Sequence, residues 1–137
     1  MSRPRLLVVD DHPIVRTALV DLLVQVGFEV AGEAVDGADA VALAKELAPD
    51  VVLMDLRMPV LSGLDAAPLI KEAWPDTQVV LLSAFESPAL EQQALDAGCF
   101  AYLVKGGPPG DLRLAIHRAV ASRRALLGPS GSAAVDL

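Results

Sequence analysis

A short apolar run in the middle of the chain, residues 51–54, ends at Asp55 and is followed by Pro59. Four to eight apolar residues between turn signals are typical of a strand that is buried on both faces. Such strands belong to parallel sheets covered by helices, and ligands bind beyond the carboxyl ends of their strands. The run therefore predicts that Asp55 lies where an open α/β protein carries out its chemistry.

Strand-like and helix-like segments alternate about five times along the sequence. Besides the run that ends at Asp55, strands are predicted at residues 5–10, 28–34, 78–83 and 100–104, the second of them as an edge strand. Helices are predicted over residues 13–26, 36–47, 64–74, 87–97 and 111–126. This alternation predicts an α/β fold with a doubly wound, five-stranded parallel sheet, helices on both faces and right-handed crossovers.

The third predicted helix is irregular because Ala67-Pro68 falls inside it. Proline lacks a backbone donor and disfavours helical geometry in the residue before it. Two alternatives remain open: the helix begins late, near Ala66, or it is kinked at the proline.

Composition narrows the class of protein. No apolar block of the 137-residue chain approaches the roughly 18 to 20 residues that span a bilayer, and Asp10 and Asp11 end the first block too early for a signal peptide. A net charge of −7 disfavours direct binding to nucleic acid or to anionic membranes. The single cysteine, Cys99, is interpreted as a small buried residue, and a cytoplasmic location is expected.

Polar residues close four of the predicted strands: Asp10-Asp11, Asp55, Ser83 and Lys105. Each alone is commonly a turn or cap residue, but parallel strands bring their carboxyl ends to one edge of the sheet. Three carboxylates at that edge require a compensating cation, for which Mg²⁺ is suited. Lys105 adds a second positive charge and Ser83 a hydrogen-bond donor. Together they predict a cradle for a phosphoryl group, with a carboxylate as nucleophile.

These residues stand in motifs that resemble the receiver domain of bacterial two-component response regulators, from residue 5 to about residue 126. The motifs are Val9-Asp10-Asp11-His12-Pro13, Asp55-Leu56-Arg57-Met58-Pro59 with Ser62-Gly63, Ser83-Ala84, Ala97-Gly98 and Tyr102-Leu103-Val104-Lys105. The first and last are most similar to the NarL/FixJ (LuxR-type) subfamily. The resemblance implies a flavodoxin-like (CheY-like) fold with strand order 2-1-3-4-5.

The resemblance also implies roles for individual residues. Asp55 would be the phosphoacceptor, receiving its phosphoryl group from the histidine of a sensor histidine kinase. Asp11, Asp55 and the backbone carbonyl of Arg57 would hold Mg²⁺, with Asp10 acting through water.

A second set of roles concerns the response to phosphorylation. Lys105 would pair with the phosphoryl oxygens, and Ser83 would move to bond one of them. Tyr102 would turn inward as Ser83 moves and change the surface around the last strand and its flanking helices. The domain would be a switch that catalyses only its own phosphotransfer and dephosphorylation, and not a turnover enzyme.

Three departures from the family pattern affect loops and a helix. Val60 and Leu61 replace a glycine-containing loop, which makes that loop more apolar and stiffer. Pro68 interrupts the third helix, and residues 106–109 (Gly-Gly-Pro-Pro) replace a polar loop after Lys105. None of these departures removes a group that the predicted chemistry needs.

Other functions fit the sequence less well. A phosphatase of the haloacid-dehalogenase kind needs a second acid two residues after its nucleophile, and Arg57 occupies that place. A flavodoxin-like binder needs a phosphate-cradling loop after the first strand, where this chain has Asp-Asp-His-Pro. A receiver that works unphosphorylated is disfavoured by the intact set of site residues. His12 is either a metal ligand or, as favoured, a structural loop residue, whereas His117 is assigned to a solvated helix face.

Domain organisation and partners complete the expectations. Residues 1–127 are predicted to form the receiver domain, and residues 128–137 a linker or disordered tail. The resemblance implies that the output is transcription, through a DNA-binding domain absent from this chain. The chain is then either an excised receiver, which is favoured, or a single-domain regulator. Apolar residues on the outer faces of the first and last helices suggest a homodimer surface, namely Val20, Val24, Leu114 and Ala121.

Overall fold

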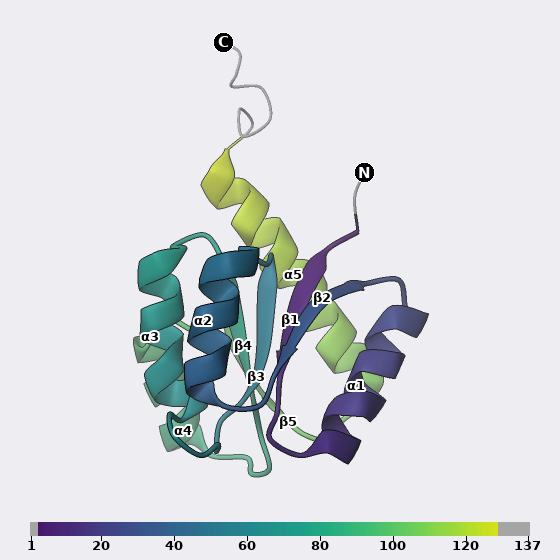
Figure 1. Ribbon diagram of the computed structural model, residues 1–137, viewed down its shortest axis with the longest axis vertical. Helices are drawn as coiled ribbons and strands as arrows, with labels where there is room; N and C mark the ends of the chain where they lie inside the picture. The colour runs from purple at the N-terminus through teal and green to yellow at the C-terminus, as the bar shows by residue number, and fades with distance from the viewer. Residues whose placement is uncertain (1–2, 129–137) are drawn as a thin grey trace.

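The computed structural model describes residues 3–128 and contains one five-stranded parallel sheet with strand order β2-β1-β3-β4-β5, as predicted (Figure 1). The strands are β1 (Arg5–Val9), β2 (Glu29–Ala34), β3 (Val51–Asp55), β4 (Gln78–Ser83) and β5 (Ala101–Val104). The helices are α1 (Pro13–Gln25), α2 (Gly37–Leu47), α3 (Gly63–Ala73), α4 (Pro88–Asp96) and α5 (Pro109–Leu127). The linker or tail predicted for residues 128–137 lies outside the described residues, except for Gly128.

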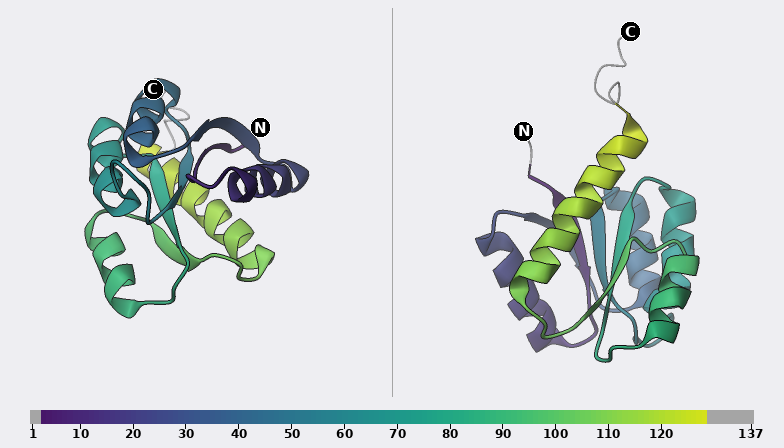
Figure 2. Two further views of the ribbon diagram at one scale, coloured as in Figure 1. Left: turned by 60° about the horizontal axis from the view of Figure 1, so that its bottom comes forward. Right: turned by 180° about the vertical axis from the view of Figure 1, so that it is seen from behind.

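Helices cover both faces of the sheet, with α1 and α5 on one side and α2, α3 and α4 on the other (Figures 1 and 2). Successive side chains of a strand point to opposite faces, so β3 contributes to both cores. Val51 and Leu53 pack with Leu23 of α1 and Ile116 of α5. The alternate residues of β3, Val52 and Met54, pack with the alanines of α2, α3 and α4. All of β3 is therefore buried, as its uninterrupted apolar sequence predicts.

Side-chain caps fix the starts of α2, α3 and α4. Asp36 accepts a hydrogen bond from the Asp39 N–H (2.8 Å), Ser62 from Asp65 (3.1 Å) and Ser87 from Leu90 (3.2 Å). Such a cap satisfies a backbone donor that the first helical turn leaves unpaired.

The late start considered for the third helix is wrong, because α3 begins at Gly63 and contains Pro68. The Ser62 cap holds the first turn, and Ala66, Ala67 and Ile70 are completely buried against the core. Packing of this face offsets the hydrogen bond that proline cannot donate.

The last helix, α5, also begins earlier than predicted. It starts at Pro109, since proline suits the first helical position.

The apolar side chains of α1 are only partly buried. Leu23 is buried, but Ile14 at the start of α1 is 86% exposed. Val20, which the sequence pattern assigns to the outer surface, instead packs against the core formed with α5. The helix is thus rotated relative to a simple amphipathic pattern, and its first turn leaves an apolar residue in solvent.

Cys99 is buried, in agreement with its interpretation as a core residue. Burial raises the pKa of its thiol to about 12, so the nucleophilic thiolate is scarce near neutral pH.

Trp74, at the end of α3, donates a hydrogen bond from Nε1 to the Lys45 carbonyl (3.2 Å) and so ties α3 to α2. Within residues 3–128, no helix combines the length and apolar character needed to cross a membrane.

Candidate functional site

The four predicted strand ends lie at the carboxyl edge of the sheet. Asp10 follows β1, Asp55 ends β3, Ser83 ends β4 and Lys105 follows β5. The register places Asp55 opposite Leu82 and Ser83 opposite Val104, so the ends of β3, β4 and β5 are level. Parallel pairing therefore brings together groups that are far apart in the sequence.

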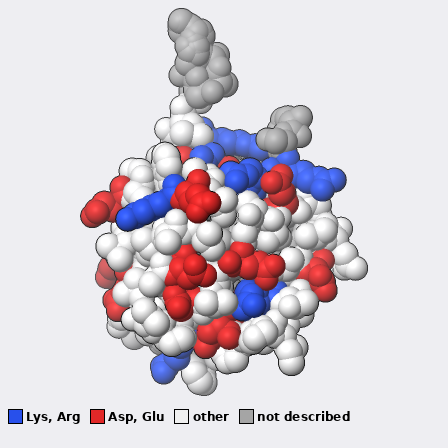
Figure 3. Space-filling model, viewed as in Figure 1, with Lys and Arg blue, Asp and Glu red and all other residues white. Residues whose placement is uncertain are grey.

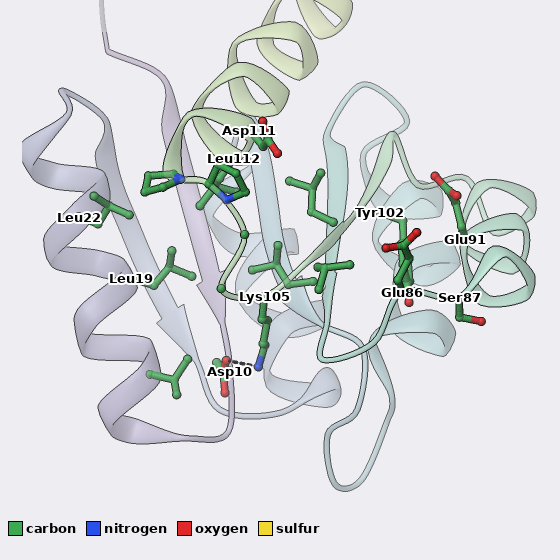
Figure 4. Close-up of a pocket in the computed structure, with 18 of the residues that line it drawn as sticks. Asp10, Leu19, Leu22, Glu86, Ser87, Glu91, Tyr102, Lys105, Asp111 and Leu112 are labelled. Atoms are coloured by element: carbon green, nitrogen blue, oxygen red, sulfur yellow. Dashed lines mark hydrogen bonds and ion pairs between the residues drawn. The ribbon is translucent and has the colours of Figure 1, made fainter.

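Lys105 joins two buried carboxylates at this edge. Its Nζ lies 2.9 Å from Asp10 Oδ2 and 3.1 Å from Asp55 Oδ2, and the contact with Asp10 is drawn in Figure 4. The Lys105 side chain is 24% exposed, against 2% for Asp10 and 7% for Asp55. Because water is largely excluded, these contacts are stronger than surface ion pairs.

The two carboxylates differ in their pKa values. Burial raises the pKa of Asp55, as does the nearby charge of Asp10, and Lys105 offsets only part of this effect. Burial also acts to raise the pKa of Asp10, but hydrogen bonds from the His12 backbone and from Lys105 outweigh it, and the pKa is lowered. Burial acts to lower the pKa of Lys105, yet its contacts with both carboxylates raise it. Asp10 and Lys105 are therefore a stable ion pair, and Asp55 carries the less compensated charge.

Asp11 and His12 extend this group into a candidate cation site. Ligand atoms of Asp10, Asp11, His12 and Asp55 all lie within 4.8 Å of one another. Asp11 Oδ1 is buried and accepts no hydrogen bond, although His12 Nδ1 is 3.1 Å away. A buried oxygen without a donor is costly, and a divalent cation would satisfy it. The residues present therefore fit Mg²⁺, which prefers carboxylate oxygens.

Ser83 and Tyr102 both contact the backbone of Phe85. The Phe85 N–H donates a hydrogen bond to Ser83 Oγ (3.2 Å), and the Tyr102 hydroxyl donates to the Phe85 carbonyl (2.6 Å). Tyr102 is buried, with only 8% of its surface exposed. The segment after β4 is therefore linked to both residues of the predicted switch, and Tyr102 occupies an inward position.

Arg57 lies on the exposed side of the site, and its guanidinium carbon is 6.0 Å from the centroid of the Phe85 ring. This distance is at the outer limit of a cation–π contact. Its side chain is therefore at the rim and not among the buried carboxylates.

The sequence did not reveal that Arg16 contacts the backbone of Asp10, or that Gly63 lies close against the carbonyl of Asp55. Arg16 donates a hydrogen bond to the Asp10 carbonyl (2.8 Å) and pairs with Glu33 (3.1 Å), which fixes the turn after β1. A Cβ at Gly63 would overlap the carbonyl oxygen of Asp55. A glycine next to the loop after Asp55 was the available signal for this approach.

The loop between β3 and α3 has an unusual backbone at Val60. Its φ is +69°, its side chain is 81% exposed, and the Leu61 N–H donates to the Pro59 carbonyl (2.7 Å) across it. A β-branched residue in this left-handed region is strained by about 1 to 3 kcal/mol.

We expect Val60→Gly to stabilise the protein by about 1 kcal/mol, because glycine adopts positive φ without this strain. The gain is smaller than the strain because glycine also increases the entropy of the unfolded chain. Urea unfolding of both proteins measures the difference. A decrease in stability of the same size would show that Val60 is not strained in solution.

The chain is similar to a known family over most of its length. The family model described as "Response regulator receiver domain" matches residues 6–117. The response regulator GacA of Pseudomonas aeruginosa is 38% identical over 121 residues, which cover 88% of this chain and 56% of GacA. The transcriptional regulatory protein PdtaR of Mycobacterium tuberculosis is 41% identical over 132 residues, covering 95% of this chain and 63% of PdtaR. The chain thus spans roughly three-fifths of the length of these regulators.

Solved structures agree with the sequence matches. The receiver domain of NarL from Mycobacterium tuberculosis superposes with a TM-score of 0.83 at 35% identity, covering 88% of this chain and 98% of that one. A LuxR-family response regulator from Aurantimonas gives a TM-score of 0.84 at 34% identity, covering 90% and 89%. These similarities concern both the fold and the sequence of nearly the whole described chain.

Proposed function

This chain belongs to the response regulator receiver family, whose members act as phosphoacceptors, and from that membership we propose that Asp55 is its phosphoacceptor. The observation that carries the proposal is the position of Lys105 Nζ, 2.9 Å from Asp10 and 3.1 Å from Asp55. A cation fixed between two buried carboxylates, of which Asp55 carries the less compensated charge, is suited to neutralise the charge that phosphorylation of Asp55 brings.

The reaction is a transfer from a phosphohistidine. A carboxylate oxygen of Asp55 bonds to phosphorus while the bond from phosphorus to the histidine nitrogen breaks, and the electron pair leaves with that nitrogen. Lys105 offsets the charge on the phosphoryl oxygens, and Asp10 keeps Lys105 in place. The donor is a sensor histidine kinase, as in the family.

Mg²⁺ is the proposed cofactor. The residues that would hold it are Asp11, Asp55 and Arg57, the last through its backbone carbonyl, and Asp10 would contribute through water. When bound, the ion neutralises charge on the transferred group. The unpartnered Oδ1 of Asp11 supports this assignment.

The response to phosphorylation is a change of surface. Ser83 bonds a phosphoryl oxygen and gives up the Phe85 N–H, and this changes the segment whose Phe85 carbonyl is bonded by Tyr102, which already lies inward. The domain is a signalling switch and not a turnover enzyme. A phosphatase remains the weaker alternative. It needs a general acid two residues after Asp55, and Arg57, which occupies that position at the rim of the site, cannot act as one.

The output is proposed to be the control of transcription through a DNA-binding domain outside this sequence, with residues 1–127 as the receiver. The name of PdtaR, a transcriptional regulatory protein, supports this output. Direct nucleic-acid binding by the receiver itself is not proposed, because acidic and basic side chains are interspersed on the face shown in Figure 3. The cytoplasmic location stays a prediction.

A homodimer through α1 and α5 is also proposed. Val24 (51% exposed) and Leu114 (49% exposed) remain candidates for its surface, together with the exposed Ala121, whereas Val20 is no longer one. We expect phosphorylated protein to sediment as a dimer and Val24→Glu to shift it to monomer. Identical sedimentation of the two proteins would count against this surface.

The test of the phosphoacceptor combines acetyl phosphate, Mg²⁺ and intact mass spectrometry. We expect the parent protein to gain one phosphoryl group and Asp55→Asn to gain none. A gain that persists in Asp55→Asn, or that never occurs in the parent, would refute the proposal. Loss of the gain on chelation of Mg²⁺ is expected as well.

A further inference from the structure

His12 is the residue of the cation site that the family roles leave without a task. It is the N-cap residue of α1, yet its side chain makes no capping hydrogen bond. The backbone N–H of His12 donates to Asp10 Oδ1 (2.9 Å), which turns the residue toward the site. Its side chain is 63% exposed, so the contacts of the imidazole are not imposed by burial.

The imidazole nitrogen faces two carboxylates at equal distance. His12 Nδ1 lies 3.1 Å from Asp10 Oδ1 and 3.1 Å from Asp11 Oδ1. An octahedral cation with ligands at about 2.1 Å places adjacent ligand atoms about 3.0 Å apart. His12 Nδ1 and Asp11 Oδ1 therefore have the spacing of adjacent ligands of one metal ion. The contact with Asp10 is a hydrogen bond, whereas the contact with Asp11 is not, so hydrogen bonding accounts for the first distance but not for the second.

We propose that His12 is a further ligand of the cation held by Asp11 and Asp55, and that it raises the affinity for divalent metals that bind imidazole nitrogen, such as Co²⁺, Ni²⁺ and Zn²⁺. Carboxylate and water ligands suit Mg²⁺, whereas imidazole suits the later first-row metals. The inference rests on the proposed function, because the same cluster holds Mg²⁺ there. It adds that metals other than Mg²⁺ compete for this receiver.

Co²⁺ is a suitable probe because it is paramagnetic and accepts imidazole nitrogen. The experiment measures Co²⁺ and Mg²⁺ affinities by calorimetry for the parent, His12→Ala and His117→Ala, and records proton NMR spectra of the Co²⁺ complexes. His117 is the matched control, because it is the other of the two histidines of the chain. It belongs to α5 and lies beside Phe28, not in the cation site.

The parent and His117→Ala should show a strongly shifted, exchangeable imidazole N–H resonance with Co²⁺, and His12→Ala should lack it. We expect His12→Ala to weaken Co²⁺ binding about tenfold or more and Mg²⁺ binding by less than about threefold. Equal Co²⁺ affinity in the parent and His12→Ala, with no shifted resonance in either, would overturn the assignment of His12.

Failure of the proposed function would look different. If Asp11→Asn left both Co²⁺ and Mg²⁺ affinities unchanged, the cation would not bind at this cluster. The proposed Mg²⁺ site and the assignment of His12 as a ligand would then both fail. If Asp11→Asn abolished Mg²⁺ binding while His12→Ala changed neither affinity, only the role of His12 would be rejected.

Discussion

Replacing Lys105 with methionine is expected to slow phosphorylation of Asp55 by about 100-fold or more, because fixed charges of this kind contribute that much to a reaction rate. Lys105 Nζ lies 3.1 Å from Asp55 Oδ2, and methionine keeps most of the side-chain length without the charge. The rate of phosphoryl gain from acetyl phosphate, measured by intact mass at saturating Mg²⁺, tests this. Lys45→Met, on the exposed side of α2, is the matched control and should react like the parent.

The same substitution should lower stability. Without Lys105, the buried carboxylates of Asp10 and Asp55 repel each other with no fixed cation between them. We expect a loss of about 2 kcal/mol in buffer without divalent metal, less than for a fully buried pair, and partial recovery on adding Mg²⁺. Asp10→Asn in the Lys105→Met background should also restore stability, because it removes one of the two charges. An unchanged phosphorylation rate in Lys105→Met would contradict the role given to this lysine.

Gly63→Ala is expected to destabilise the protein by about 3 kcal/mol or more. A Cβ at this position would overlap the carbonyl oxygen of Asp55 and approach Leu81 Cδ2 to 3.0 Å. Backbone and buried side chain cannot both move aside without shifting the end of β3, so phosphorylation should slow as well. Denaturant unfolding and the acetyl phosphate assay measure the two effects.

Gly110→Ala is the matched control for Gly63→Ala. It lies in the first turn of α5, as Gly63 does in α3, but a Cβ added at Gly110 would meet nothing within 4 Å. We expect a gain of about 0.5 to 1 kcal/mol there, because alanine favours the helix over glycine. If both substitutions had the same effect on stability, the close approach at Gly63 would be disproved.

The strand ends were predictable because each apolar run stops at a polar residue. Buried parallel strands need no alternation, and their carboxyl ends must share an edge, so the sequence alone places Asp10, Asp55, Ser83 and Lys105 together. The helices were less predictable where two effects oppose each other. At α3, the effect of Pro68 suggested a late start, but the Ser62 cap and the buried alanines outweighed it.

Contacts that depend on the course of loops could not be predicted. The bond from Tyr102 to the Phe85 carbonyl requires the path of the segment after β4, and the positive φ of Val60 is foreign to a β-branched residue. Arg16 reaches Asp10 from the first turns of α1, and nothing in an amphipathic pattern marks that residue. The sequence favoured a structural role for His12, whereas its two equal distances to carboxylates give reason to test it as a ligand.

The most direct test of the phosphoacceptor assignment is the chemical identification of the phosphorylated residue. The protein is treated with acetyl phosphate and Mg²⁺, the acyl phosphate is reduced with borohydride, and peptide mass spectrometry locates the resulting homoserine. We predict homoserine at position 55 and an intact aspartate at positions 10 and 11. Homoserine at position 10 or 11, or at no position despite a mass gain of the intact protein, would contradict the assignment of Asp55 as phosphoacceptor.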